Sequence, residues 1–278
     1  MTKFGVCFLM VFGELALGGT LALAIPPFFK IERGFYKSSA AVYLAAGLIS
    51  AVGLGLLASR GYRPQAPRPT TLWALSAIWA AFCLILSFYL FTLWTDNGLV
   101  RARAYTFSLG VGLLAVIANA LVLEPASFGL LAASLYAITA IFSSLVLGLA
   151  SAAMLFGHWY LIDRTLPVDY IRTFVRLLGI ALVADLAILI LVPALLALFG
   201  GSEASIAARS LAGPELGLMA SRMLFGPAAS IALVWMCRQT LKIPNTMAAT
   251  GLLYLTLMSV LVGEMLGRFI LFRTAIPL

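Results

Sequence analysis

Charged residues are scarce in this chain. They make up 10% of its 278 residues, while 63% are hydrophobic and the mean hydropathy is +1.08. Soluble globular domains carry roughly 25% charged residues. The composition therefore excludes an ordinary soluble protein and predicts an all-α, polytopic integral membrane protein. We expect one transmembrane domain over residues 1–278, with no soluble domain.

The sequence also lacks short segments of alternating polarity, which are typical of transmembrane β-barrels. Its apolar runs are unbroken, and a membrane-spanning helix needs about 20 largely apolar residues. The sequence predicts a bundle of eight transmembrane helices, near residues 5–28, 39–58, 71–94, 104–123, 131–160, 173–199, 216–237 and 246–270.

Two of these stretches leave alternatives. Lys3 precedes the first stretch, and Ala22-Leu23-Ala24 resembles a signal-peptide cleavage site. Because Glu14 interrupts the apolar run, we interpret this stretch as a retained helix. The fifth stretch runs from Phe128 to Ile162 with hardly a polar break, which fits either a long tilted helix or a short interfacial helix leading into a span.

Histidine and cysteine are also rare, with one and three residues respectively. A single histidine excludes a haem held by two histidines of this chain and a multi-histidine metal centre. The cysteines are scattered through the predicted spans and read as packing residues, so we expect no metal site. The net charge of +8 lies mainly in membrane-flanking loops, where lipid head groups rather than nucleic acid are the expected partner.

The distribution of Lys and Arg predicts an orientation. The connections after the first, third, fifth and seventh predicted spans carry more of them than the connections on the other side, although the basic connection at 60–69 opposes this trend. Inner loops are enriched in positive residues. The sequence therefore predicts a multi-pass membrane protein with both termini facing outward, which in the bacterial cytoplasmic membrane, the expected location, is the periplasmic side.

Five ionisable residues stand out inside predicted spans, where a charge is costly and is a functional candidate. Four of them, Glu14, Arg222, Glu264 and Arg268, fall in the half of the membrane that we assign as outer. Glu264 and Arg268 are four residues apart and can pair on one helical face. This agreement in depth predicts one polar pocket, although tolerance for charge near the interface also explains it.

Glycines accompany the last pair. Gly263 and Gly267 form a small-xxx-small pattern that lets another helix approach closely. The pair therefore reads either as part of a functional pocket or as a neutralised packing lock. Asp185 lies deeper, and is either a proton-relay group or an acid kept neutral by burial.

The only histidine, His158, is followed by Trp159 and Tyr160 at the inner end of the fifth span. These side chains could hydrogen-bond to a quinone head group and stack on it. Alternatively, they belong to the aromatic belt found at membrane interfaces.

The two ends of the chain resemble a known family. The C-terminal run at 262–272, with its Gly-Glu-x-x-Gly-Arg pattern, resembles the last helix of the membrane anchor subunit of dimethyl sulfoxide reductase. The run at 10–14, followed by Gly18-Gly19, looks like the same family's first helix, where Gln is common in place of Glu14. The Gly-His-Trp-Tyr segment does not match, and the early helices lack the family's histidine, so the resemblance indicates a divergent member of the NrfD/polysulfide-reductase-like superfamily.

This resemblance implies a haem-free, quinone-interacting subunit of an electron-transfer complex, binding menaquinone or ubiquinone and docking an iron–sulfur or cytochrome subunit. Glu264 or Glu14 would exchange the quinol proton, with Asp185 as relay. Arg268, Arg222 and the segment at 158–160 would hold the quinone. The alternatives are a proton- or ion-coupled transporter, for which Pro193 and Pro227 are weak indications, and a purely structural anchor subunit that binds lipid.

Overall fold

The computed structural model describes residues 2–62, 70–123, 128–163, 165–243 and 245–278. Within these ranges the chain is helical, with no strand, and eight helices are long and apolar enough to cross a membrane. This confirms an all-α, polytopic membrane fold. The chain divides into two compact units, Met1–Ser144 and Leu145–Leu278.

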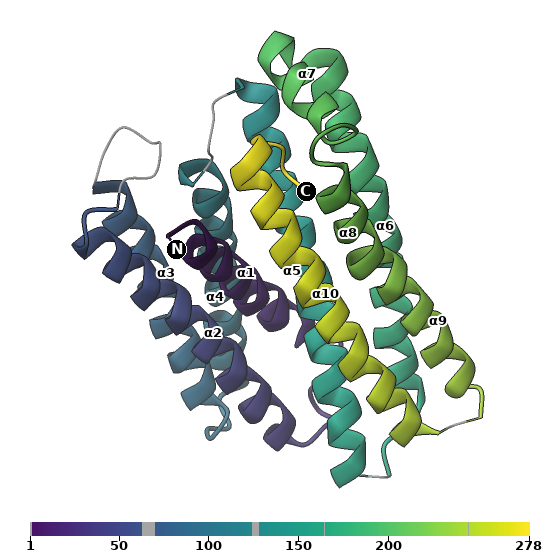
Figure 1. Cartoon of the computed structure of the whole chain (residues 1–278). Coiled ribbons are helices and arrows are strands. Elements are labelled where there is room, and N and C mark those ends of the chain that lie inside the picture. The colour runs from purple at the N-terminus through teal and green to yellow at the C-terminus, as the bar shows by residue number, and fades with distance from the viewer. Residues whose placement is uncertain (1, 63–69, 124–127, 164, 244) are drawn as a thin grey trace. The chain divides into compact units, whose positions relative to one another are not determined.

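The N-terminal unit is built around four helices, drawn from purple to blue-teal in Figure 1. They are α1 (Thr2–Ala22), α2 (Arg33–Ser59), α3 (Thr70–Thr92) and α4 (Gly98–Val122). Each packs against the next, and α1 also packs against α4, which closes the set. Serine hydroxyls link neighbours: Ser50 Oγ donates to the Leu9 carbonyl and Ser76 Oγ to the Ala51 carbonyl, both at 2.8 Å. Such interhelical hydrogen bonds stabilise helix pairs inside a membrane, where burial of apolar side chains contributes little to the association of helices.

Glycines set the close packing of this unit. A methyl group added at Gly13 would lie 2.5 Å from the Trp79 ring, and one added at Gly19 would lie 2.0 Å from the Tyr43 ring. Both rings are completely buried. The glycines around Glu14 therefore have a packing role, since they let large aromatic rings lie directly on the α1 backbone.

The C-terminal unit begins within α5 (Leu130–Ile162) and continues through α6 (Asp169–Phe199), a short helix α7 (Gly201–Ser210), and α10 (Thr246–Thr274). Its seventh span is interrupted: α8 (Leu216–Met223) passes into a π-helical turn, η1 (Leu224–Ala228), and then into α9 (Ala229–Thr240). Helix α10 packs along α8, η1 and α9, and α6 packs against η1 and α9. Phe156 of α5 meets Phe174 of α6 with ring centroids 5.3 Å apart.

Several boundaries differ from the prediction. The first helix ends at Ala22 rather than near 28, because the segment that follows contains Pro26 and Pro27, which have no amide hydrogen to donate to a continuing helix. The second and fourth helices each begin six residues earlier than predicted, at Arg33 and Gly98. The Asn97 side chain caps the fourth by accepting from the Val100 amide at 3.1 Å.

The fifth stretch holds one continuous helix of 33 residues, so no break separates an interfacial helix from the span, and its tilt stays a prediction. Helix α7 was not predicted, because its ten residues are too short and too polar to span a membrane. Residues 63–69 and Arg164, which contribute to the predicted orientation, lie outside the described residues.

Candidate functional site

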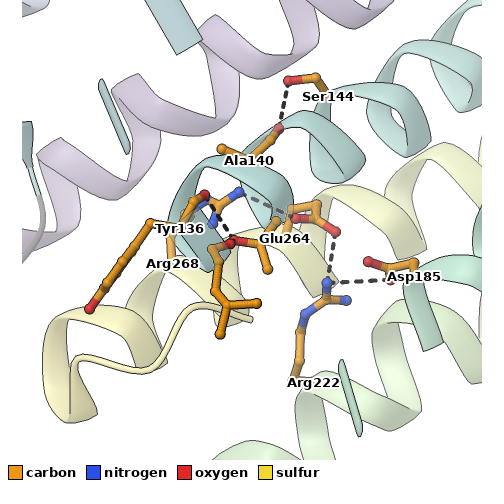
Figure 2. A network of polar contacts seen from close by, with 9 residues as sticks. Tyr136, Ala140, Ser144, Asp185, Arg222, Glu264 and Arg268 are labelled. Carbon is orange, nitrogen blue, oxygen red and sulfur yellow. Dashed lines mark hydrogen bonds and ion pairs between the residues drawn. The ribbon is translucent and has the colours of Figure 1, made fainter. Parts of the chain in front are cut away.

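A charge network lies inside the C-terminal unit, with Arg222 at its centre (Figure 2). Arg222 Nη2 donates to Glu264 Oε1 at 2.8 Å and lies 3.4 Å from Asp185 Oδ2. The three residues come from α8, α10 and α6. The Arg222 and Glu264 side chains are each 1% exposed, and that of Asp185 is 7% exposed. Three helices that are separate in sequence therefore converge on one guanidinium.

Arg268 completes the network from the next turn of α10. Its Nη2 lies 4.0 Å from Glu264 Oε2, and it is as deeply buried as Glu264. The predicted i,i+4 pair therefore exists, but the closer partner of Glu264 is Arg222. With every group ionised, the two carboxylates and two guanidiniums balance, which is the condition under which buried charges are tolerated.

Small residues make room for the network. A methyl group added at Gly263 would lie 2.4 Å from the Gly226 Cα and 3.0 Å from Arg222 Nη1, and one at Gly267 would lie 3.0 Å from Arg222 Nε. The glycines therefore let α10 approach η1 closely, with the guanidinium lying against the backbone. The small-xxx-small pattern of α10 thus leaves the space that the Arg222 side chain occupies in the network.

The predicted site residues divide into groups. Asp185, Arg222, Glu264 and Arg268 come together, with Asp185 in direct contact with Arg222. Glu14 is buried in α1 and belongs to the N-terminal unit. The common pocket for Glu14 and Glu264 therefore stays a prediction.

The residues at 158–160 lie toward the opposite end of α10. His158 Nδ1 is 3.3 Å from the hydroxyl of Tyr254, and the Tyr160 hydroxyl donates to the Pro167 carbonyl. Tyr254 is ten residues from Glu264, or about 15 Å along a helix. The structure does not bring this segment to the charge network, and its contacts fit an interfacial aromatic cluster.

The sequence matches no protein-family model and none of the curated proteins. Among the described residues, no group of three or more His, Cys, Asp and Glu side chains is placed to hold a metal ion.

A second candidate site, not predicted from the sequence, lies within the N-terminal unit. It is a cavity of about 410 Å³ where the α1–α2 connection meets the ends of α3 and α4. Its lining combines one arginine with five aromatic rings, Arg101 with Phe28, Phe29, Tyr36, Tyr89 and Tyr105. The available signal was the aromatic cluster near Pro26-Pro27, with three tyrosines at the ends of neighbouring predicted spans.

The polar groups of this aromatic cavity are held in place. The Arg101 guanidinium is 4.3 Å from the centre of the Phe28 ring and donates to the Thr95 carbonyl at 3.3 Å. The Tyr105 hydroxyl donates to the Thr20 carbonyl at 2.9 Å. Planar rings beside a cation suit a flat, oxygen-bearing ligand, because rings stack and the guanidinium donates hydrogen bonds.

An exposed ion pair closes the same end of the unit. Arg33 Nη2 lies 2.7 Å from Asp96 Oδ1 and joins the start of α2 to the α3–α4 connection. The hydrogen bond from Arg33, and then its charge, lower the pKa of Asp96 below its usual range.

Proposed function

We propose that this chain is the haem-free, quinone-interacting membrane subunit of an electron-transfer complex, and a divergent member of the NrfD/polysulfide-reductase-like superfamily. The observation that carries the proposal is the buried network in which Asp185 and Glu264 share Arg222. Acids buried inside a span are expensive and are expected to serve a purpose. Accepting a proton from a quinol is such a purpose, and it requires no metal-binding residues in this chain.

The geometry suits proton exchange. If Glu264 takes a proton, Arg222 keeps Asp185 as a partner, so the network can change its charge by one without leaving this arginine unpaired. Oxidation of a quinol releases two protons and two electrons. In the proposed role Glu264 accepts a proton, the second proton leaves to the aqueous phase, and both electrons pass to an iron–sulfur or cytochrome centre in a partner subunit.

The aromatic cavity of the N-terminal unit offers a place for a quinone ring. Its volume of about 410 Å³ falls within the range of small-molecule sites, and Arg101 supplies a donor for a quinone oxygen. Menaquinone and ubiquinone both fit this chemistry. The proposed setting is the bacterial cytoplasmic membrane, with both termini facing the periplasm.

Substitution of Glu264 by Gln in the assembled complex tests the proton role. Gln keeps the shape of the side chain but cannot exchange a proton, so quinol oxidation is expected to fall by about a hundredfold, the scale of general acid–base catalysis. Glu264→Asp, which keeps the acid, should restore part of the rate. Undiminished turnover of Glu264→Gln in a normally assembled complex would contradict the proposal.

The matched control is Glu215→Gln. Glu215 pairs with Arg273 at 2.7 Å, with the Arg273 side chain 50% exposed. The substitution therefore removes the same charge and an ion pair of the same unit, but leaves the buried network intact. Quinol oxidation should stay within about twofold of the unmodified complex.

One observation favours the alternative of a proton- or ion-coupled transporter. The π-helical turn with Pro227 interrupts the seventh span directly beside the network, and interrupted helices often mark transport sites. Flux of protons or ions in liposomes that contain only this chain would support the transporter. Absence of flux, together with quinol oxidation in the complex, would support the subunit role.

A further inference from the structure

A basic pocket and an apolar groove lie end to end between α6 and α9 of the C-terminal unit. The pocket has a volume of about 220 Å³ and is lined by four cationic side chains, Arg172, Arg176, Arg238 and Lys242. The groove, of about 360 Å³, has apolar walls and shares Arg176 and Arg238 with the pocket. The two therefore form one continuous surface with a charged end and an apolar body.

The charged end carries an excess of positive charge. Arg172 is paired with Asp169 at 3.0 Å and donates to the Leu241 carbonyl at 2.9 Å, which ties α6 to the end of α9. Over the part of the chain that the structure describes, the other three cations have no carboxylate partner. Four cations against one acid leave three positive charges, all on exposed side chains.

The groove runs from this end toward the middle of the spans. On α6, Val183 lies seven residues beyond Arg176, which is about 10 Å along the helix. Gly179 leaves the floor open, since a methyl group there would only touch Val234 at 3.4 Å. Its walls include exposed apolar side chains, among them Ile180 and Trp235, 61% and 60% exposed.

We propose that this surface binds one anionic phospholipid, with its phosphodiester among the four cations and an acyl chain along the groove. The occupant follows from the shape and the charge together: a phosphate-bearing head at the end of a span and an apolar tail extending into it. Basic pockets between transmembrane helices are suited to such head groups. The inference does not depend on the proposed redox role.

Titration of the delipidated full chain with phosphatidylglycerol, followed by native mass spectrometry, tests this site. We expect a saturable adduct of one lipid per chain, and much weaker binding of phosphatidylcholine, whose head group carries no net charge. Each cation near an anionic head contributes about fivefold in affinity. Arg176→Gln/Arg238→Gln should therefore weaken binding by about twenty-five-fold.

A charge-matched control is Lys30→Gln/Arg103→Gln, which removes two exposed cations of the N-terminal unit that line neither the pocket nor the groove. It should change the affinity by less than about twofold. Equal losses of affinity in both double variants would mean that binding reflects only the general attraction between a basic protein and anionic lipid. That result would overturn the proposal.

The apolar half of the proposal is tested separately by Gly179→Leu, which fills the groove without changing the charge. It should weaken phosphatidylglycerol binding at least fivefold, and it keeps the proposal testable if the arginine variants fail to fold. Glycerol phosphate supplies the head without the tail. If it competes as well as the lipid, or if Gly179→Leu binds phosphatidylglycerol normally, the groove does not hold an acyl chain and the proposal fails.

Discussion

Substitution of Gly263 by alanine should separate α10 from the π-helical turn. The added methyl carbon would lie 2.4 Å from the Gly226 Cα, whereas carbon atoms in contact are about 3.5–4.0 Å apart. The backbones must therefore move apart by roughly 1 Å. The hydrogen bond from Arg222 Nη2 to Glu264 Oε1, now 2.8 Å long, would then exceed the usual limit.

The magnitude follows from these two effects. Overpacking of a well-filled contact costs about 1–3 kcal/mol, and loss of a hydrogen bond to a charged group about 1.5–3 kcal/mol. Relaxation reduces both, so the free energy of unfolding should fall by about 2–5 kcal/mol. Alanine also stabilises a helix by about 1 kcal/mol relative to glycine. A control substitution of another glycine by alanine in the same helix cancels this contribution.

That control is Gly251→Ala. Gly251 lies in the same helix, and a methyl group there would meet nothing within 4 Å. The assay is unfolding of both variants in mixed micelles with increasing SDS, followed by circular dichroism. If Gly263→Ala proves as stable as Gly251→Ala, the close approach of α10 to η1 does not exist and the account of the network is wrong.

Two further predictions concern carboxylates. Asp185→Asn should lower the free energy of unfolding less than Glu264→Gln does in the same assay, because Arg222 lies 3.4 Å from Asp185 and 2.8 Å from Glu264; a larger effect of Asp185→Asn would reverse this order. The pKa of Asp96 is lowered by Arg33, so its contribution to stability is complete above the unfolded value of about 3.9 and is lost as the pH falls through the folded value. Melting temperatures measured against pH should therefore show less acid sensitivity for Asp96→Asn than for the unmodified chain, and identical pH profiles would contradict the role of Arg33.

The spans were predictable because membrane crossing requires long apolar runs, and length and composition record that requirement directly. The pairing of Glu264 with Arg268 was also predictable, since it depends only on helical spacing. The main partner of Glu264 was not, because contact with Arg222 depends on which helices are neighbours in the bundle. For the same reason, the sequence did not predict the aromatic cavity around Arg101, whose residues come from four separate segments.

The π-helical turn explains why Arg222 in particular reaches the network. The buried face of α9 carries Ser230, Val234 and Cys237, at helical spacing. Extended backward through a regular α-helix, that face would reach Met223, seven residues before Ser230. The buried residue is instead Arg222, eight residues before, and Met223 is partly exposed.

A π-turn accommodates one extra residue and so shifts the helix face by about 100°. Because of this shift, the side chain that faces α10 is Arg222, whereas a regular α-helix would place Met223 there. Pro227 leaves the turn short of one amide donor, and the Ser259 hydroxyl of α10 donates to the Phe225 carbonyl within it. The irregular turn thus costs backbone bonding but places a guanidinium between two carboxylates. A chain that needed only to fill the membrane would gain nothing from that exchange, so the turn itself favours a functional role for the network.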